Sequence, residues 1–241
     1  MLHLPFSHSS KIPPLVLGRR GRFPFSPLYR VPYSTLAAHI HIIGRSGKGK
    51  SKILENMLSQ HIVNGIGCGL IDPHSLLIDD LIRNLISRGV LDDPAIRARI
   101  IYVDPARKDY TIPFNPLRTK DEPYRVVAAI LEAMRRTFPT LKAAPHFENL
   151  MTHALLVLIK TDNTLMDLTR LLVDAEYREA LLVQAEDPNL TSFFENRFDK
   201  WGRQAPLMLE STLNKVTAFS INPFLSAMLG QKENVLDFAQ I

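Results

Sequence analysis

Short apolar runs alternate with longer helical patterns between residues 36 and 117. The short runs are rich in β-branched residues and have the length of buried strands, whereas the longer ones repeat their apolar residues every three to four positions. The predicted order is strand 37–43, helix 50–64, strand 67–72, helix 75–88 and strand 99–104. Because such alternation is typical of a parallel sheet with helices on its faces, the sequence predicts an α/β fold.

The pattern changes after this region, and from about residue 121 to 229 nearly every segment is predicted to be helical. Three strands are too few to complete a sheet of this kind, so the helical block is interpreted as an insertion. The first residues are rich in proline, and we expect there an arm with one or two short edge strands. The predicted organisation is an N-terminal arm at 1–34, the first half of an α/β core at 35–118, a helical insertion subdomain at 119–230, and an incomplete return to the core at 231–241.

The segment between the first predicted strand and helix fits the phosphate-binding pattern G-x-x-x-x-G-K-[ST]. It consists of Gly44, Arg45, Ser46, Gly47, Lys48, Gly49, Lys50 and Ser51. Its glycines let the backbone approach a polyphosphate, so that N–H groups of residues 47–52, Lys52 included, point at the β-phosphate. Lys50 is the predicted catalytic side chain and contacts the β- and γ-phosphates, while Ser51 coordinates Mg²⁺. The loop therefore predicts binding of ATP with Mg²⁺.

A hydrolysing site of this kind also needs an acidic group at a strand end, usually an Asp followed by a Glu that orients water. Asp72 and Asp104 each follow a mainly apolar run and precede a proline. Both are candidate magnesium-linked groups, and the alternative is that they cap strand ends and fix turns. Since neither is followed by Glu, the sequence leaves open whether the chain is an ATP hydrolase.

Two further segments extend the pattern beyond the loop. Leu70-Ile71-Asp72-Pro73-His74 ends the second predicted strand, and Pro113-Phe114-Asn115-Pro116-Leu117 follows the third. With the loop, they resemble the HerA/FtsK-type ATPases, especially those of conjugation and type IV secretion, over roughly residues 36–241. The resemblance implies a RecA-like P-loop NTPase core, an oligomeric ring, and an ATP-driven DNA translocase. That family usually has Gly where this chain has Ser75, and its acidic pair follows the helical insertion, so we expect the chain to be C-terminally incomplete.

Composition adds a preference for an anionic partner, because the net charge is +5 and the isoelectric point is about 9.4. A track for nucleic acid is one interpretation, since Lys and Arg bind phosphates without regard to sequence, and a generally solvated basic surface is the alternative. DNA is the partner that the resemblance implies. Trp201, with Arg197, Lys200 and Arg203, is a candidate site for stacking and clamping a nucleic-acid strand, with ordinary packing as the alternative. No apolar run is long enough to span a bilayer, and we expect a cytoplasmic location or one at the periphery of the inner membrane.

Other functions stay open at this point. The chain could bind nucleotide without turnover, as a non-catalytic remnant or an interaction subunit. A small-molecule kinase would need an Arg-rich lid, for which the helical block offers only Arg135-Arg136. The phosphate loop itself does not distinguish a DNA substrate from a protein substrate.

Overall fold

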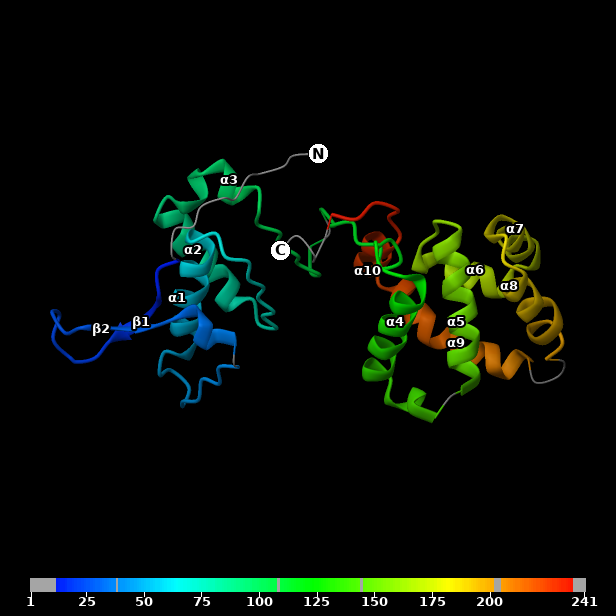
Figure 1. Ribbon diagram of the computed structural model, residues 1–241, viewed down its shortest axis with the longest axis horizontal. Helices are drawn as coiled ribbons and strands as arrows, with labels where there is room; N and C mark the ends of the chain where they lie inside the picture. The colour runs from blue at the N-terminus through cyan, green and yellow to red at the C-terminus, as the bar shows by residue number, and fades with distance from the viewer. Residues whose placement is uncertain (1–11, 38, 108, 144, 202–204, 236–241) are drawn as a thin grey trace. The chain divides into compact units, whose positions relative to one another are not determined.

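The computed structural model describes residues 12–37, 39–107, 109–143, 145–201 and 205–235. The described chain is mainly helical and divides after Ile101 into two compact units (Figure 1). Residues 1–11 of the predicted arm, Ala38 of the first predicted strand and residues 236–241 of the predicted return lie outside the described residues. No described helix is both long and apolar enough to cross a membrane.

The first unit is built around one helix that carries a β-hairpin on one side and a second helix on the other. Its elements are β1 (Leu15–Arg19), β2 (Leu28–Val31), η1 (Tyr33–Ala37), α1 (Lys50–Val63), α2 (Leu76–Ser87), η2 (Val90–Asp92) and α3 (Pro94–Arg97). β1 and β2 pair antiparallel, with a bulge between Val16 and Gly18, and α1 packs against both β1 and α2. The expected edge strands of the arm and the helices predicted at 50–64 and 75–88 are thereby confirmed.

The prediction of a parallel α/β sheet is wrong. Among the described residues the strands are β1 and β2, and the segments 39–43, 67–72 and 100–104 carry no strand pairing. The side chains of Ile43 and Ile71 are 82% and 94% exposed. A parallel strand is bonded along its edges and covered by helices on both faces. Because these apolar segments are unpaired and lie at the surface, the described chain does not have the predicted RecA-like core.

The second unit is a helical bundle. Its elements are α4 (Pro123–Thr137), η3 (Pro139–Ala143), α5 (Pro145–Lys160), η4 (Leu165–Asp167), α6 (Leu168–Val173), α7 (Ala175–Ala185), α8 (Pro188–Phe193), the π-helical turn η5 (Phe194–Phe198), α9 (Ala205–Ile221) and α10 (Pro223–Leu229). α5 packs against α4, α6, α7, α8 and α9. Its apolar residues point in all directions, as expected of a helix enclosed by others.

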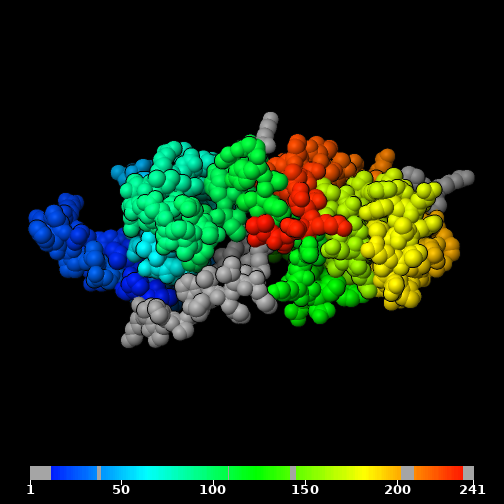
Figure 2. Space-filling model, turned by 90° about the horizontal axis from the view of Figure 1, so that it is seen from above, coloured from blue at the N-terminus to red at the C-terminus, as the bar shows by residue number. Residues whose placement is uncertain are grey.

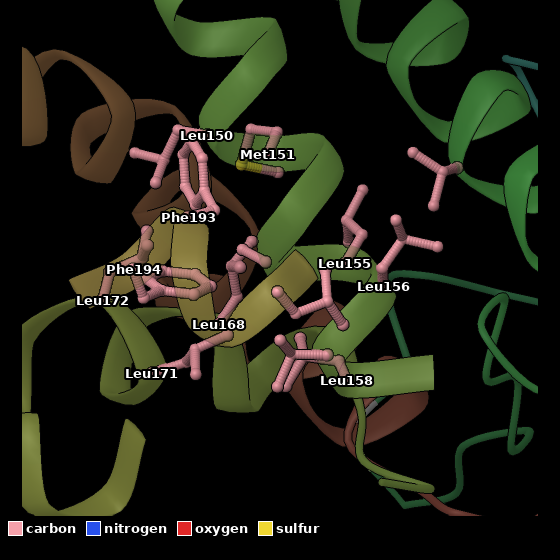
Figure 3. Packing of buried hydrophobic residues seen from close by; sticks show 14 of the residues in the cluster. Leu150, Met151, Leu155, Leu156, Leu158, Leu168, Leu171, Leu172, Phe193 and Phe194 are labelled. Carbon is pink, nitrogen blue, oxygen red and sulfur yellow. The ribbon is translucent and has the colours of Figure 1, made fainter. Parts of the chain in front are cut away.

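The core of this bundle forms where α5 meets α6 and the end of α8. Leu150, Leu155 and Leu158 of α5 are fully buried, as is Phe194 at the start of η5. Figure 3 shows these side chains gathered into one cluster with those of α6. Burial of apolar side chains, at about 1.5–3 kcal/mol each, is therefore the main force that holds this unit together.

Short polar residues before prolines set the helix starts, as the sequence predicts. Asp187 precedes Pro188, and its carboxylate accepts a hydrogen bond from the N–H of Asn189 at 3.0 Å. Asn222 precedes Pro223, and its side chain caps α10 in the same way. Proline is tolerated in the first turn of a helix because its missing N–H would have no acceptor there.

Candidate phosphate-binding site

The predicted phosphate loop leads directly into α1, whose first residue is Lys50. Gly47 and Gly49 have φ angles of 74° and 86°, in the left-handed region that side chains with a Cβ disfavour. No other atom lies within 4 Å of the place that a Cβ would occupy at either position. Glycine is therefore favoured at these two positions by the backbone conformation and not by a lack of space for a side chain.

The side chain of Lys50 folds back over the loop. Its Nζ donates a hydrogen bond to the carbonyl oxygen of Arg45 at 3.1 Å. The N–H of Lys48 donates to the same carbonyl at 3.3 Å. A Cβ on Gly44 would lie 3.6 Å from Cγ of Lys50, so the stem of the lysine runs beside the beginning of the loop. The loop thus curls around the ammonium group.

The first turn of α1 leaves its backbone donors available. The first N–H groups of a helix have no acceptor within the helix. Ile53 is bonded to the carbonyl of Gly49 at 3.0 Å, while no described residue accepts a hydrogen bond from the N–H groups of residues 49–52. Ser51 lies exposed in the same turn. Free donors at the positive end of a helix are the arrangement to which phosphate binds.

The side chain of Lys52 is directed elsewhere. Its ammonium lies 2.7 Å from Glu55 and 2.8 Å from Asp80. The hydrogen bond to Asp80, and then that to Glu55, raise the pKa of Lys52. The same contact with Lys52 lowers the pKa of Asp80. The part of Lys52 that remains open to a ligand is its backbone N–H.

These contacts belong to a polar seam between α1 and α2 that sequence reasoning missed. Glu55 is buried, and its carboxylate also accepts a hydrogen bond from Asn84 of α2 at 3.0 Å. One turn further on, Arg88 donates to the hydroxyl of Ser59 at 2.7 Å. The signal was present as polar residues at positions 52, 55 and 59, which share a face of a helix. The seam fixes α2 beside the helix that carries the loop.

Asp72 caps the N-terminus of α2. Its carboxylate accepts hydrogen bonds from the N–H groups of Leu77 at 2.8 Å, His74 at 3.1 Å and Ile78 at 3.2 Å. Loss of solvent acts to raise the pKa of Asp72, but these N–H donors outweigh it and the pKa is lowered. Both carboxylate oxygens are engaged, so the contacts favour the capping interpretation over the magnesium-linked one.

The turn at this cap has an unusual backbone conformation. Ser75 has a φ of 62°, in the left-handed region, and it occupies the position where the resembled family has glycine. The backbone turn is therefore present in this chain, at the cost of placing a residue with a Cβ in a disfavoured conformation.

Asp104, the other acidic candidate, lies in the second unit. Its Oδ1 accepts a hydrogen bond from the N–H of Ala106 at 2.9 Å, which fixes the turn after Pro105. The Tyr102 hydroxyl lies 3.4 Å from its Oδ2. Within the described residues, no group of three or more His, Cys, Asp and Glu side chains could hold a metal ion. Ser51, Asp72 and Asp104 thus stay single candidate ligands.

The candidate stacking residue Trp201 is partly buried and packs against the core of the bundle. Its ring centroid lies 5.1 Å from that of Phe198, and the side chain lies against the buried core of the second unit. Arg203 lies outside the described residues. These contacts favour the packing interpretation.

Comparisons with protein-family models, with curated proteins and with solved structures found no match to this chain. The function of this chain is therefore inferred from the geometry and chemistry of the phosphate loop.

Proposed function

We propose that the chain binds ATP with Mg²⁺ at the loop of residues 44–51. One observation carries the proposal. Gly47 and Gly49 adopt left-handed conformations directly before a helix whose first N–H groups have no acceptor among the described residues, and the Lys50 ammonium lies over the same loop. The ammonium supplies positive charge and the N–H groups supply hydrogen-bond donors, which suits a polyphosphate.

In the bound state the Lys50 ammonium would exchange the Arg45 carbonyl for the β- and γ-phosphates. A bond to a charged oxygen is stronger than one to a neutral carbonyl, so the exchange is favourable. The Ser51 hydroxyl, exposed in the first turn of α1, would supply a ligand to Mg²⁺, with phosphate oxygens and water as the others. Arg45 and Lys48 are exposed beside the loop and add attraction for an anion.

The proposal is tested by equilibrium titration of the chain with a fluorescent ATP analogue in the presence of Mg²⁺. Lys50→Ala should weaken binding by about 10- to 100-fold, the loss expected for one charged hydrogen bond. Lys200→Ala makes the same change of charge in the second unit, where the lysine contacts Asn196, and should bind like wild type. Equal affinity of wild type and Lys50→Ala would show that the site is assigned wrongly.

The finer function that we propose is that of an ATP-driven DNA translocase or DNA-transfer ATPase of the HerA/FtsK kind, acting as an oligomer. This proposal rests on the sequence segments around Asp72 and Phe114 together with the phosphate loop. It does not rest on the parallel sheet, which the described residues do not form. Binding of DNA at low salt that falls as salt is raised is the expected behaviour. The absence of any DNA binding at low salt would count against it.

A second candidate is nucleotide binding without turnover. It is favoured by Asp72, whose carboxylate accepts hydrogen bonds from the N–H of His74 and from two N–H groups of α2. This candidate predicts phosphate release close to the uncatalysed rate, even when ATP is bound. Substantial phosphate release that is lost in Lys50→Ala would exclude it and favour the translocase.

A further inference from the structure

Two phenylalanines stand exposed at the end of the β1–β2 hairpin. Phe23 is 78% exposed and Phe25 is 96% exposed, with Pro24 between them. In Figures 1 and 2 the loop that joins β1 and β2 points away from α1 and α2. Single exposed apolar residues are ordinary, but two adjacent aromatic rings at the end of a projecting hairpin make an apolar tip. We call residues 19–26 the hairpin tip.

The tip is held by its own hydrogen bonds. The N–H of Ser26 donates to the carbonyl of Phe23 at 3.0 Å, which closes a β-turn with Pro24 at its first central position. Nη1 of Arg19 donates to the carbonyl of Ser26 at 3.0 Å. A Cβ on Gly21 would lie 2.6 Å from Oγ of Ser26, so the two sides of the loop are in close contact there. The rings are thus presented outward by an ordered turn, and the order does not depend on packing against the rest of the unit.

Positive charge surrounds the apolar tip. Arg19, Arg20, Arg22 and Arg30 are exposed on the hairpin, and Arg20 lies over the ring of Tyr29 at 5.4 Å. The first 54 residues contain nine Lys and Arg and no Asp or Glu. The net positive charge of the chain is therefore concentrated in the part that contains the hairpin and the phosphate loop, and the hairpin partner that fits is anionic.

Order along the hairpin distinguishes two kinds of anionic partner. Phe23 and Phe25 lie in the turn of the hairpin, whereas Arg19 and Arg30 lie on its two strands. This order matches the depth order of a bilayer surface, with acyl chains below and phosphates above. Single-stranded nucleic acid is bound instead in a groove, along which aromatic platforms follow the backbone.

We propose that the hairpin tip binds the surface of an anionic membrane, with Phe23 and Phe25 inserted at the level of the acyl boundary and the arginines bound to lipid phosphates. The interaction is peripheral, because only two rings are buried. It uses residues separate from the phosphate loop, so the failure of ATP binding would not affect it.

The test is co-sedimentation of the full chain with large unilamellar vesicles. Wild type should bind equimolar phosphatidylcholine and phosphatidylglycerol vesicles and bind neutral phosphatidylcholine vesicles at least about fivefold more weakly, since each arginine near the surface adds to the attraction. The double variant Phe23→Ser/Phe25→Ser should lose at least about tenfold in partitioning, because each buried ring contributes strongly. Both side chains are largely exposed, so the fold should be retained, as checked by an unchanged thermal midpoint.

Matched variants distinguish binding by the hairpin tip from nonspecific binding of vesicles by other exposed aromatic or basic residues. Tyr124→Ser removes an aromatic ring that is 71% exposed in the second unit and should leave vesicle binding unchanged. Arg20→Gln/Arg22→Gln should reduce binding to anionic vesicles and leave the weak binding to neutral ones, while Arg125→Gln, on α4, should not change either.

Three outcomes would overturn the proposal. They are no sedimentation of wild type with anionic vesicles, equal binding of wild type and Phe23→Ser/Phe25→Ser, and affinity for DNA that the same double variant loses while vesicles are not bound. The last would assign the tip to nucleic acid instead.

Discussion

The side-chain amide of Gln60 bonds both backbone groups of Val16. Its Oε1 accepts a hydrogen bond from the N–H at 2.9 Å, and its Nε2 donates to the carbonyl at 2.8 Å. Asn56, one turn earlier on α1, donates to the same carbonyl at 2.7 Å. The neighbouring Leu15 is fully buried. A helix side chain thus satisfies the backbone of β1 where a third strand would otherwise do so.

Gln60→Leu should therefore destabilise the first unit. It removes two hydrogen bonds and leaves the Val16 backbone groups without these partners, a loss of about 1–3 kcal/mol. Denaturant unfolding measures the change, and amide hydrogen exchange at Val16 should accelerate. Gln231→Leu is the control, because that glutamine is exposed at the end of α10 and its loss should stay within about 0.5 kcal/mol. Similar stability of the two variants would contradict the role of Gln60.

Ser75→Gly should stabilise the protein. Ser75 has a left-handed backbone conformation that glycine adopts freely, and relief of this strain outweighs the added freedom of the unfolded chain. The expected gain is about 0.5–1 kcal/mol. Ser87→Gly, at the last position of α2, should instead cost stability, because its backbone is helical. A loss of stability in Ser75→Gly would argue against strain at this turn.

Asp72→Asn should lower the thermal midpoint at neutral pH and remove part of the acid sensitivity. The pKa of Asp72 is lowered in the folded state from its ordinary value of 3.8, so its stabilisation is complete above that value. It is lost as the pH falls through the lowered pKa. The difference between wild type and variant, followed by thermal unfolding from about pH 7 to pH 2, should narrow at the acid end. Asp121→Asn removes the same charge at an exposed loop position and is the control for the loss of a negative charge.

Arg178→Met should cost more than Asp199→Asn, although the two residues form an ion pair. Arg178 is buried, bonds the carboxylate of Asp199 at 2.9 Å, and lies 5.0 Å from the centre of the Phe198 ring. It also donates to the carbonyls that end α6, Leu171 and Leu172. Its removal should cost about 2–3 kcal/mol, whereas Asp199 is half exposed and its neutralisation should cost under about 1 kcal/mol. Equal losses in denaturant unfolding would show that the ion pair, and not the carbonyl contacts, dominates.

The helices could be predicted from the sequence because their signals are local. Apolar spacing indicates α1 and α2, and Asp187 and Asn222 before prolines indicate the starts of α8 and α10. The phosphate loop could be located for the same reason, since its glycines act on their own backbone angles.

The buried strands predicted at 37–43, 67–72 and 99–104 are wrong, because the pairing of a strand depends on partners far away in the sequence. Ile43 and Ile71 belong to runs that are as apolar as buried strands, yet the structure leaves both exposed and unpaired. Conversely, the β1–β2 hairpin is held to α1 by Gln60, and nothing in the spacing of a glutamine indicates that it will bond a strand 44 positions away. β-propensity reports a fit to a surface and does not identify that surface.

The length of α1 gives the hairpin and the phosphate loop a common frame. The helix begins at Lys50 and holds β1 through Asn56 and Gln60, so the loop and the strand attach to a single rigid rod about 15 Å apart along its axis. Binding of the hairpin to a membrane would therefore also constrain the direction from which a nucleotide reaches the phosphate loop. A protein tethered by Phe23 and Phe25 would therefore present its phosphate loop at one fixed orientation to the surface that holds it.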